Sequence, residues 1–210
     1  MTPQGGHKYP HPPSPADLGL LSDADAGAAR RRTGADLTRM KKFRFQLLAE
    51  WIGANFPPCA VADVGGGKGL LAYLLQGAGF SCTVIDPVDQ ALPDKYRDLA
   101  SGRQLKVPAS ASVPRLTREF RAGLAERFDL LVALHAHGVN LQILDAVRDH
   151  GVSCVVLPCC VIGEPSVPEI GLDWFTWLTD EARESGLPVE YFYLNFKGQN
   201  VGFYIRGKRP

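Results

Sequence analysis

The sequence predicts an α/β fold with a mostly parallel, seven-stranded sheet, helices on both faces and an antiparallel hairpin at the end of the chain. Two observations lead to this prediction. Short apolar segments alternate with helix-like segments through five units, which is typical of a parallel sheet covered by its crossover helices. After a further helix, the chain closes with two β-rich segments separated by Lys197-Gly198-Gln199, which is typical of a hairpin.

Each expected strand is a short run rich in apolar residues and bounded by polar residues, Gly or Pro. Each expected helix has apolar residues at helical spacing, and several end at a glycine, while Pro114 stands near the start of one of them. The expected strands are 59–64, 81–86, 103–110, 128–136, 152–160, 188–196 and 200–208. The expected helices that alternate with them are 69–79, 114–127, 140–151 and 169–186.

The charge, the apolar runs and the cysteines indicate which partners and which location to expect. The 210 residues carry a formal net charge of +1, so the overall charge favours neither nucleic acid nor a membrane as partner. Apolar runs are far shorter than the ~20 residues that span a bilayer, and the N-terminal stretch lacks the apolar core of a secretory signal. Five cysteines, two of them adjacent, do not form the pattern of a disulfide framework. We therefore expect reduced thiols, a cytoplasmic location and no membrane contact.

Three parts are expected along the chain. Residues 1–22 are a flexible N-terminal arm, because Pro, Gly and His are frequent near its start. Residues 23–53 are a basic helical extension, with apolar residues at helical spacing and Arg and Lys between them. Residues 54–210 are the main domain. The extension is expected to pack its apolar stripe on that domain.

A glycine-rich turn joins the first expected strand to its helix. It has the sequence Asp63-Val64-Gly65-Gly66-Gly67-Lys68-Gly69. A strand, such a turn and a helix N-terminus together present backbone N–H groups to a ligand. A phosphate-binding P-loop would have Ser or Thr after Lys68, and the NAD fingerprint would have a third glycine where Leu70 stands. Neither of these two patterns is complete.

The pattern present, D-x-G-x-G-x-G, resembles motif I of the class I S-adenosylmethionine (SAM) dependent methyltransferases, which have a Rossmann-like fold. The resemblance covers roughly residues 50–206. It implies that the glycines approach the nucleoside and methionine parts of SAM. It also implies that Asp63 engages the amino end of the methionine, and that Asp86, at the end of the second strand, holds the ribose hydroxyls. The cofactor-binding residues expected on this basis are Asp63, Gly65, Gly66, Gly67, Gly69, Asp86, Ser110 and His135.

The acceptor-side residues are expected after the fourth and fifth strands, at the carboxyl edge of the sheet. The segment after the fourth strand contains His135, His137 and Asn140, and Cys159 and Cys160 follow the fifth. This pairing resembles the branch that contains the acceptor-stem tRNA 2′-O-methyltransferases, which carry a His-x-Cys-Gly-x-x-Thr-Asp-like segment and a Cys-Cys pair. Here a histidine replaces the cysteine of that segment, and the Thr-Asp is absent. The candidate catalytic residues are His135, Asn140 and Cys159.

Alternatives remain open for these side chains. His135 either caps its strand by hydrogen bonds, or it orients the acceptor or serves as general base, since a histidine of ordinary pKa is largely neutral at pH 7. The cysteine pair is a packed strand end, a metal site together with His135 and His137, or a nucleophile. A metal site would need four converging ligands, and the C-x-x-C spacing that supports one is missing. We therefore predict no metal site.

The predicted function is a SAM-dependent methyltransferase acting on structured RNA (tRNA or rRNA). Lys41, Lys42 and Arg44 of the basic helix would contact the RNA backbone, although a solvated basic face on a packing helix explains the same charges. The alternatives are a methyltransferase acting on a small molecule and a non-catalytic SAM-fold protein that serves in binding or assembly.

Overall fold

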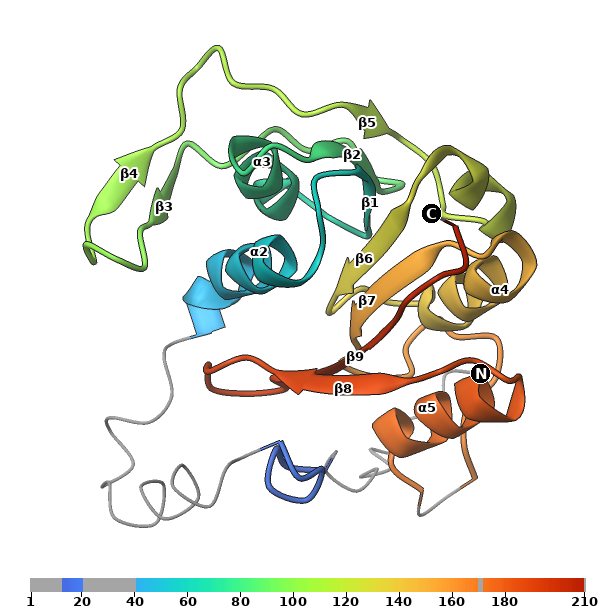
Figure 1. Cartoon of the computed structure of the whole chain (residues 1–210). Helices are drawn as coiled ribbons and strands as arrows, with labels where there is room; N and C mark the ends of the chain where they lie inside the picture. Colours follow the sequence, from blue (N-terminus) through green and yellow to red (C-terminus); the bar gives the residue numbers. More distant parts are fainter. Residues whose placement is uncertain (1–12, 21–40, 170–171, 210) are drawn as a thin grey trace, which may run out of the picture.

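A computed structural model describes residues 13–20, 41–169 and 172–209 (Figure 1). Within these ranges a Rossmann-like sheet runs through the molecule, with β2 paired to β1, β1 to β6 and β6 to β7 in parallel. The last two strands are antiparallel to their neighbours, so the predicted fold with its C-terminal hairpin is confirmed. In spatial order the strands are β5 (Arg115–Leu116), β2 (Ser81–Ile85), β1 (Ala60–Val64), β6 (Leu130–Leu134), β7 (Ser153–Leu157), β9 (Val201–Ile205) and β8 (Glu190–Tyr193).

Helices cover both faces of this sheet, as predicted. On one face lie α2 (Arg44–Asn55) and α3 (Leu70–Gly77), and on the other lie α4 (Asn140–His150), α5 (Trp174–Glu184) and the 3₁₀ helix η2 (Ala122–Arg127) (Figure 1). Each layer closes its own apolar cluster against the sheet, which removes that surface from water.

The helix predicted before the main domain is an integral part of the core. It begins with the 3₁₀ turn η1 (Lys41–Phe43) and continues as α2, where Leu48 and Ile52 are completely buried. Their burial fits the expected apolar stripe. The rest of the predicted 23–53 extension, residues 23–40, lies outside the described residues.

The third strand of the prediction is wrong. Within 103–110 only β4 (Gln104–Lys106) is a strand, and it pairs with β3 (Lys95–Arg97) in a separate two-stranded hairpin. All three residues of β4 are exposed, so this segment does not pack against the core as a strand of the main sheet would.

The place beside β2 is taken by β5, within the segment predicted as helix 114–127. The Pro114 carbonyl oxygen accepts a hydrogen bond from the Val84 N–H, and the Leu116 carbonyl oxygen accepts one from Asp86. Proline lacks an N–H, so it suits the start of an edge strand as well as that of a helix. The predicted helix is therefore wrong over its first half, and only η2 is helical.

The strand register places the loops that carry the candidate site residues at the carboxyl edge of the sheet. Val64 pairs with Ile85, and Leu134 pairs with Leu157, so β1, β2, β6 and β7 end side by side. The glycine loop, Asp86 and the segments after β6 and β7 therefore lie along the same carboxyl edge.

Of the predicted arm 1–22, only residues 13–20 are described. Ser14 and Asp17 hold a turn by hydrogen bonds, and Leu18 is partly buried against the main core. No helix in the described part of the chain has the length and apolar character needed to cross a membrane.

Candidate active site

The glycine loop between β1 and α3 follows a path that larger residues would obstruct. Gly65, Gly67 and Gly69 have φ angles of +65°, +53° and +80°, in the left-handed region that favours glycine. A Cβ on Gly65 would lie 2.6 Å from the Cβ of Ala136, and one on Gly66 would lie 2.5 Å from the Asp63 carboxyl group. The loop is therefore pressed against the end of β6 and against the acidic side chain that precedes it.

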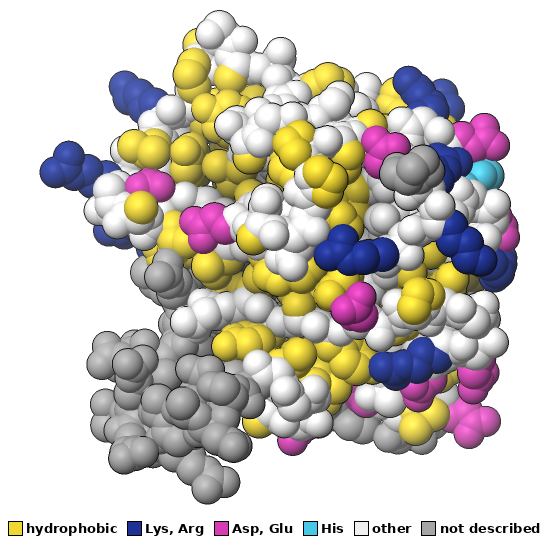
Figure 2. Space-filling model, in the orientation of Figure 1, with side chains coloured by type: hydrophobic (Ala, Val, Ile, Leu, Met, Phe, Trp, Pro, Cys, Tyr) yellow, Lys and Arg dark blue, Asp and Glu magenta, His cyan; other side chains and the backbone are white. Residues whose placement is uncertain are grey.

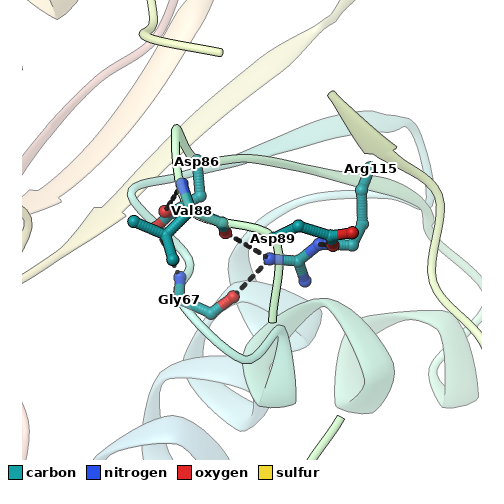
Figure 3. A network of polar contacts seen from close by, with 5 residues as sticks. All are labelled: Gly67, Asp86, Val88, Asp89 and Arg115. Atoms are coloured by element: carbon teal, nitrogen blue, oxygen red, sulfur yellow. Dashed lines mark hydrogen bonds and ion pairs between the residues drawn. The ribbon is translucent and has the colours of Figure 1, made fainter. Parts of the chain in front are cut away.

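Asp86 lies directly beside this loop. Its Oδ2 accepts a hydrogen bond from the Gly67 N–H, and its Oδ1 accepts one from the Val88 N–H, both at 2.9 Å (Figure 3). A carboxylate offers about four acceptor positions. Both oxygens can therefore still accept hydrogen bonds from a ligand while the backbone holds the group in place.

Arg115 ties the same two loops together from β5. Its guanidinium donates to the carbonyl oxygens of Gly67 and Val88, at 2.6 and 3.4 Å, and its Nε lies 3.4 Å from the Asp89 carboxylate (Figure 3). Arg115 was not among the site residues expected from the sequence. No local pattern could have indicated it, because Arg115 and Gly67 are 48 residues apart.

Two cavities meet at the glycine loop. One, of about 410 Å³, is lined by Asp63, Gly66 and Arg44 among others. The other, of about 620 Å³, is lined by Asp86, Phe120 and the segment after β6. Gly65 and His135 line both cavities, so they mark the junction between them.

The smaller cavity is lined by an acidic and a basic side chain, Asp63 and Arg44, each with one buried atom that has no hydrogen-bond partner among the described residues. The Nη1 of Arg44 donates to the Lys41 carbonyl oxygen at 3.2 Å. Asp63 is 2% exposed, and its Oδ2 makes no hydrogen bond to the described residues. Burial raises the pKa of its carboxyl group to about 7. The Nε of Arg44 is also buried without a hydrogen-bond partner among the described residues, and burial lowers the pKa of that guanidinium.

Arg44 was expected to face RNA, but it is half-buried against this cavity, with its guanidinium over the Phe45 ring. The helical spacing in the sequence indicates this buried position of Arg44. Arg44, Leu48 and Ile52 are four residues apart, so they share one helix face, and that face is the buried one.

His135, at the cavity junction, is held as a neutral imidazole. Its Nε2 lies 2.8 Å from the Gln199 carbonyl oxygen, which can only accept a hydrogen bond, so Nε2 carries the proton. Its Nδ1 is buried and has no partner among the described residues. Burial lowers the pKa of the ring to about 4. His135 also has a φ of +56°, which is strained for a residue with a side chain.

Asn140 and Ser110 are not brought to these cavities. Asn140 is buried at the start of α4, where its Nδ2 and its backbone N–H both donate to Glu164, at 2.7 and 2.9 Å. That contact fixes a helix end to the loop after β7. Ser110 is exposed in the loop after β4, away from the cavity linings.

The two cysteines after β7 lie side by side. The Sγ atoms of Cys159 and Cys160 are 3.6 Å apart, and both residues are half-buried. Burial, together with its neighbour Cys160, raises the pKa of the Cys159 thiol to about 12. Cys159 is therefore a protonated thiol at neutral pH, which is a poor nucleophile.

Comparisons with known proteins give only distant matches. No family model and no curated protein matches the sequence. The ribosomal protein L11 methylase of Lactobacillus delbrueckii subsp. bulgaricus is 18% identical, with a TM-score of 0.47, over 83% of each chain. A SAM-dependent methyltransferase from Agrobacterium tumefaciens is 12% identical, with a TM-score of 0.49, over 82% of this chain and 64% of that one.

A third structure, the 1,6-didemethyltoxoflavin-N1-methyltransferase of Burkholderia thailandensis, was solved with 1,6-didemethyltoxoflavin and S-adenosylhomocysteine bound. It is 13% identical over 79% of this chain and 77% of that one, with a TM-score of 0.46. At such low identities and TM-scores, these likenesses define neither a family nor a substrate for this chain.

Proposed function

We propose that this protein binds SAM along the two joined cavities and transfers its methyl group to an acceptor. The observation that carries this proposal is that Asp63 and Arg44, of opposite charge, both line the cavity beside the glycine loop, and that Asp63 Oδ2 and Arg44 Nε are buried without a hydrogen-bond partner among the described residues. The methionine end of SAM has an ammonium and a carboxylate. Asp63 would bind the ammonium and Arg44 the carboxylate, so one ligand would supply partners for both of these buried atoms.

The nucleoside end fits the larger cavity in this proposal. Asp86 offers both carboxylate oxygens to the ribose hydroxyls while the Gly67 and Val88 N–H groups hold it. Ile85, Phe120 and Val139 supply apolar lining for the adenine. The glycine loop supports the middle of the ligand, because only backbone without side chains permits so close an approach.

His135 would act where the methyl group is transferred. It borders both cavities, and its unprotonated Nδ1 can accept a hydrogen bond from an acceptor hydroxyl or amine. Transfer from a sulfonium is an in-line displacement, so orientation of the acceptor supplies much of the catalysis. With a pKa of about 4, the ring orients the acceptor better than it removes a proton.

For the acceptor, we retain structured RNA as the proposal. Lys41 and Lys42 support it, because both are exposed at the start of the α2 region. Arg44 does not, since it lines the cofactor cavity. On the face shown in Figure 2, the Lys and Arg side chains of the described residues are interspersed with Asp and Glu rather than gathered. On this face, RNA contact through the described residues would therefore rest on few charges.

Calorimetric titration with SAM tests the binding site. We expect Asp63→Asn, Arg44→Gln and Asp86→Asn each to weaken binding by at least ~10-fold, since each removes a charged hydrogen-bond partner. Asp149→Asn, on the exposed surface of α4, is the control and should bind as the original chain does. Equal SAM affinity in all four variants would contradict the proposal.

Transfer of tritium from methyl-labelled SAM tests the reaction and its acceptor. The label is followed separately into total RNA and into a small-molecule extract, with Asp86→Asn as the inactive control. Nuclease-sensitive label would support RNA, and label only in the extract would replace RNA by a small molecule. SAM binding without any labelled product would overturn the catalytic part of the proposal.

A further inference from the structure

Three metal-binding side chains converge beside the larger cavity. The ligand atoms of His137, Cys159 and Cys160 all lie within 4.8 Å of one another. His137 belongs to the loop after β6, and the two cysteines belong to the loop after β7. His137 and Gly163, from the same two loops, also line the 620 Å³ cavity. The cluster therefore adjoins the cavity that His135 also lines, and His135 marks the junction at which methyl transfer is proposed.

The two loops that carry these side chains are held tightly together. A Cβ on Gly138 would lie 2.8 Å from the Gly163 carbonyl oxygen, so the two backbones are in direct contact. One residue further on, Glu164 accepts hydrogen bonds from the N-terminus of α4. Gln199, from the β8–β9 hairpin, donates its Nε2 hydrogen to the Cys159 carbonyl oxygen. The donor atoms are thus brought together by backbone packing before any ligand binds.

We propose that His137, Cys159 and Cys160 bind one Zn²⁺ ion, with the fourth position open to the acceptor. Two thiolates and an imidazole form a donor set that zinc prefers, and three protein ligands with an open position are typical of catalytic zinc. With Zn–S bonds of about 2.3 Å, the 3.6 Å between the two sulfur atoms corresponds to an S–Zn–S angle of about 103°, close to tetrahedral. The ligand atom of the His137 side chain already lies within 4.8 Å of both sulfur atoms.

His135 is not part of this site. Its Nε2 is engaged by the Gln199 carbonyl oxygen, and it is absent from the converging group. The expectation of no metal site assumed four protein ligands, including both histidines. Three ligands are sufficient where the fourth position serves the reaction.

The role of the ion rests on the proposed function, whereas its binding does not. An acceptor hydroxyl or thiol bound to zinc loses its proton to solvent more readily, because the metal lowers the pKa of its ligand. The acceptor oxygen or sulfur then forms a bond to the methyl carbon. The bond from that carbon to the sulfonium breaks, and its electron pair stays on sulfur, which leaves S-adenosylhomocysteine. Zinc would in this way assist the deprotonation of the acceptor.

The test is a zinc titration of the tag-free, full-length protein, stripped of metal and kept reduced, against a chromogenic chelator. We expect one zinc per chain, and at least ~10-fold weaker binding in Cys160→Ser and His137→Ala. Cys59→Ser, at a half-buried cysteine before β1, is the matched control and should bind zinc as the original chain does. Circular dichroism shows whether each variant is folded.

Cobalt substitution gives a second readout. Co²⁺ in the site should show thiolate charge-transfer absorption that decreases stepwise in Cys159→Ser and in the Cys159→Ser/Cys160→Ser double variant. Less than one zinc per chain, or unchanged affinity in folded Cys160→Ser and His137→Ala, would overturn the proposal. SAM titration of the metal-free protein keeps the two proposals apart, since a protein that binds SAM but takes up no zinc would refute only the zinc site.

Discussion

The guanidinium of Arg115 donates a hydrogen bond to the carbonyl oxygen of Gly67 at 2.6 Å (Figure 3). Through this contact the shortest strand of the sheet supports the loop that is proposed to hold the cofactor. Gly67 also donates its N–H to Asp86, so the residue proposed to bind the ribose and the glycine loop form one connected unit. Arg115 is 16% exposed in its side chain, and its contacts are therefore only weakly screened by water.

Replacement of Arg115 should weaken SAM binding, although Arg115 is not proposed to contact SAM itself. A hydrogen bond from a charged donor contributes about 1.5–3 kcal/mol. We therefore expect Arg115→Ala to raise the dissociation constant of SAM by roughly 10-fold. Arg118→Ala changes an exposed arginine three residues along the chain and serves as the control. Calorimetry decides, and equal affinities in the two variants would show that Arg115 does not support the site.

A methyl group on Gly66 should disrupt SAM binding, whereas one on Gly53 should not. The Cβ of Gly66→Ala would lie 2.5 Å from the Asp63 carboxyl group. Because Asp63 is buried, displacement of its side chain would disturb the surrounding packing. Gly53, inside α2, has nothing within 4 Å of such a Cβ. Gly53→Ala should even stabilise the protein by about 0.5–1 kcal/mol, because alanine is the better helix former. Thermal unfolding and SAM titration of both variants check the two predictions.

Burial of Asp63 should make the free energy of unfolding fall with rising pH and the affinity for SAM rise with it. Because its pKa is raised to about 7, the native state retains a proton that the unfolded state loses near pH 4. The free energy of unfolding of the ligand-free protein should therefore fall as pH rises from about 4 to about 7, and level off above. Asp63→Asn should remove this slope, which urea titrations at several pH values would measure.

The affinity for SAM should rise over the upper part of that pH range. The ligand ammonium is bound best by the ionised Asp63 carboxylate, and this form becomes dominant as pH passes about 7. Above about pH 8 the ligand amino group itself loses its proton, and the affinity should fall again. Calorimetric titrations with SAM at several pH values measure this dependence. A pH-independent affinity between about pH 6 and about pH 8 in the original chain would contradict the role given to Asp63.

Glu164 should stabilise the acceptor-side loops through the N-terminus of α4. Its carboxylate accepts hydrogen bonds from the Asn140 side chain and from two backbone N–H groups at the positive end of the helix. We expect Glu164→Gln to lower the free energy of unfolding by about 1–2 kcal/mol. Glu169→Gln, at an exposed position, should have no such effect. Denaturant unfolding of both variants is the measurement.

The parts of the fold that the sequence predicted well are those set by local pattern. The central strands are continuous apolar runs, and their spacing by helical segments defines a parallel sheet. The glycine loop and Asp86 follow directly from strand ends, so their meeting at one edge of the sheet could be expected from the sequence alone. The terminal hairpin was likewise indicated by Gly198 between two β-rich segments.

The parts that could not be predicted depend on partners far along the chain. β5 is a strand because the backbone N–H groups of Val84 and Asp86 donate to Pro114, directly before it, and to Leu116 within it, although its own residues also suit a helix. The hydrogen bonds of Gln199 to His135 and to Cys159 join residues that are 64 and 40 positions apart in the sequence. The position of Arg44 was only partly predictable. Its helical spacing to Leu48 and Ile52 indicated the buried face of α2, whereas its charge indicated a solvent-exposed position.

The two-residue length of β5 leaves little of this edge of the sheet for pairing with a copy of the protein. A sheet edge exposes unpaired N–H and C=O groups that can recruit a strand from another molecule. At β5 the edge offers only two residues for such pairing, and Pro114 beside it has no N–H to donate. A longer β5 would add hydrogen bonds to β2, but it would also expose more unpaired N–H and C=O groups to other molecules and so favour aggregation. The short length of β5 should therefore be kept in any engineered variant.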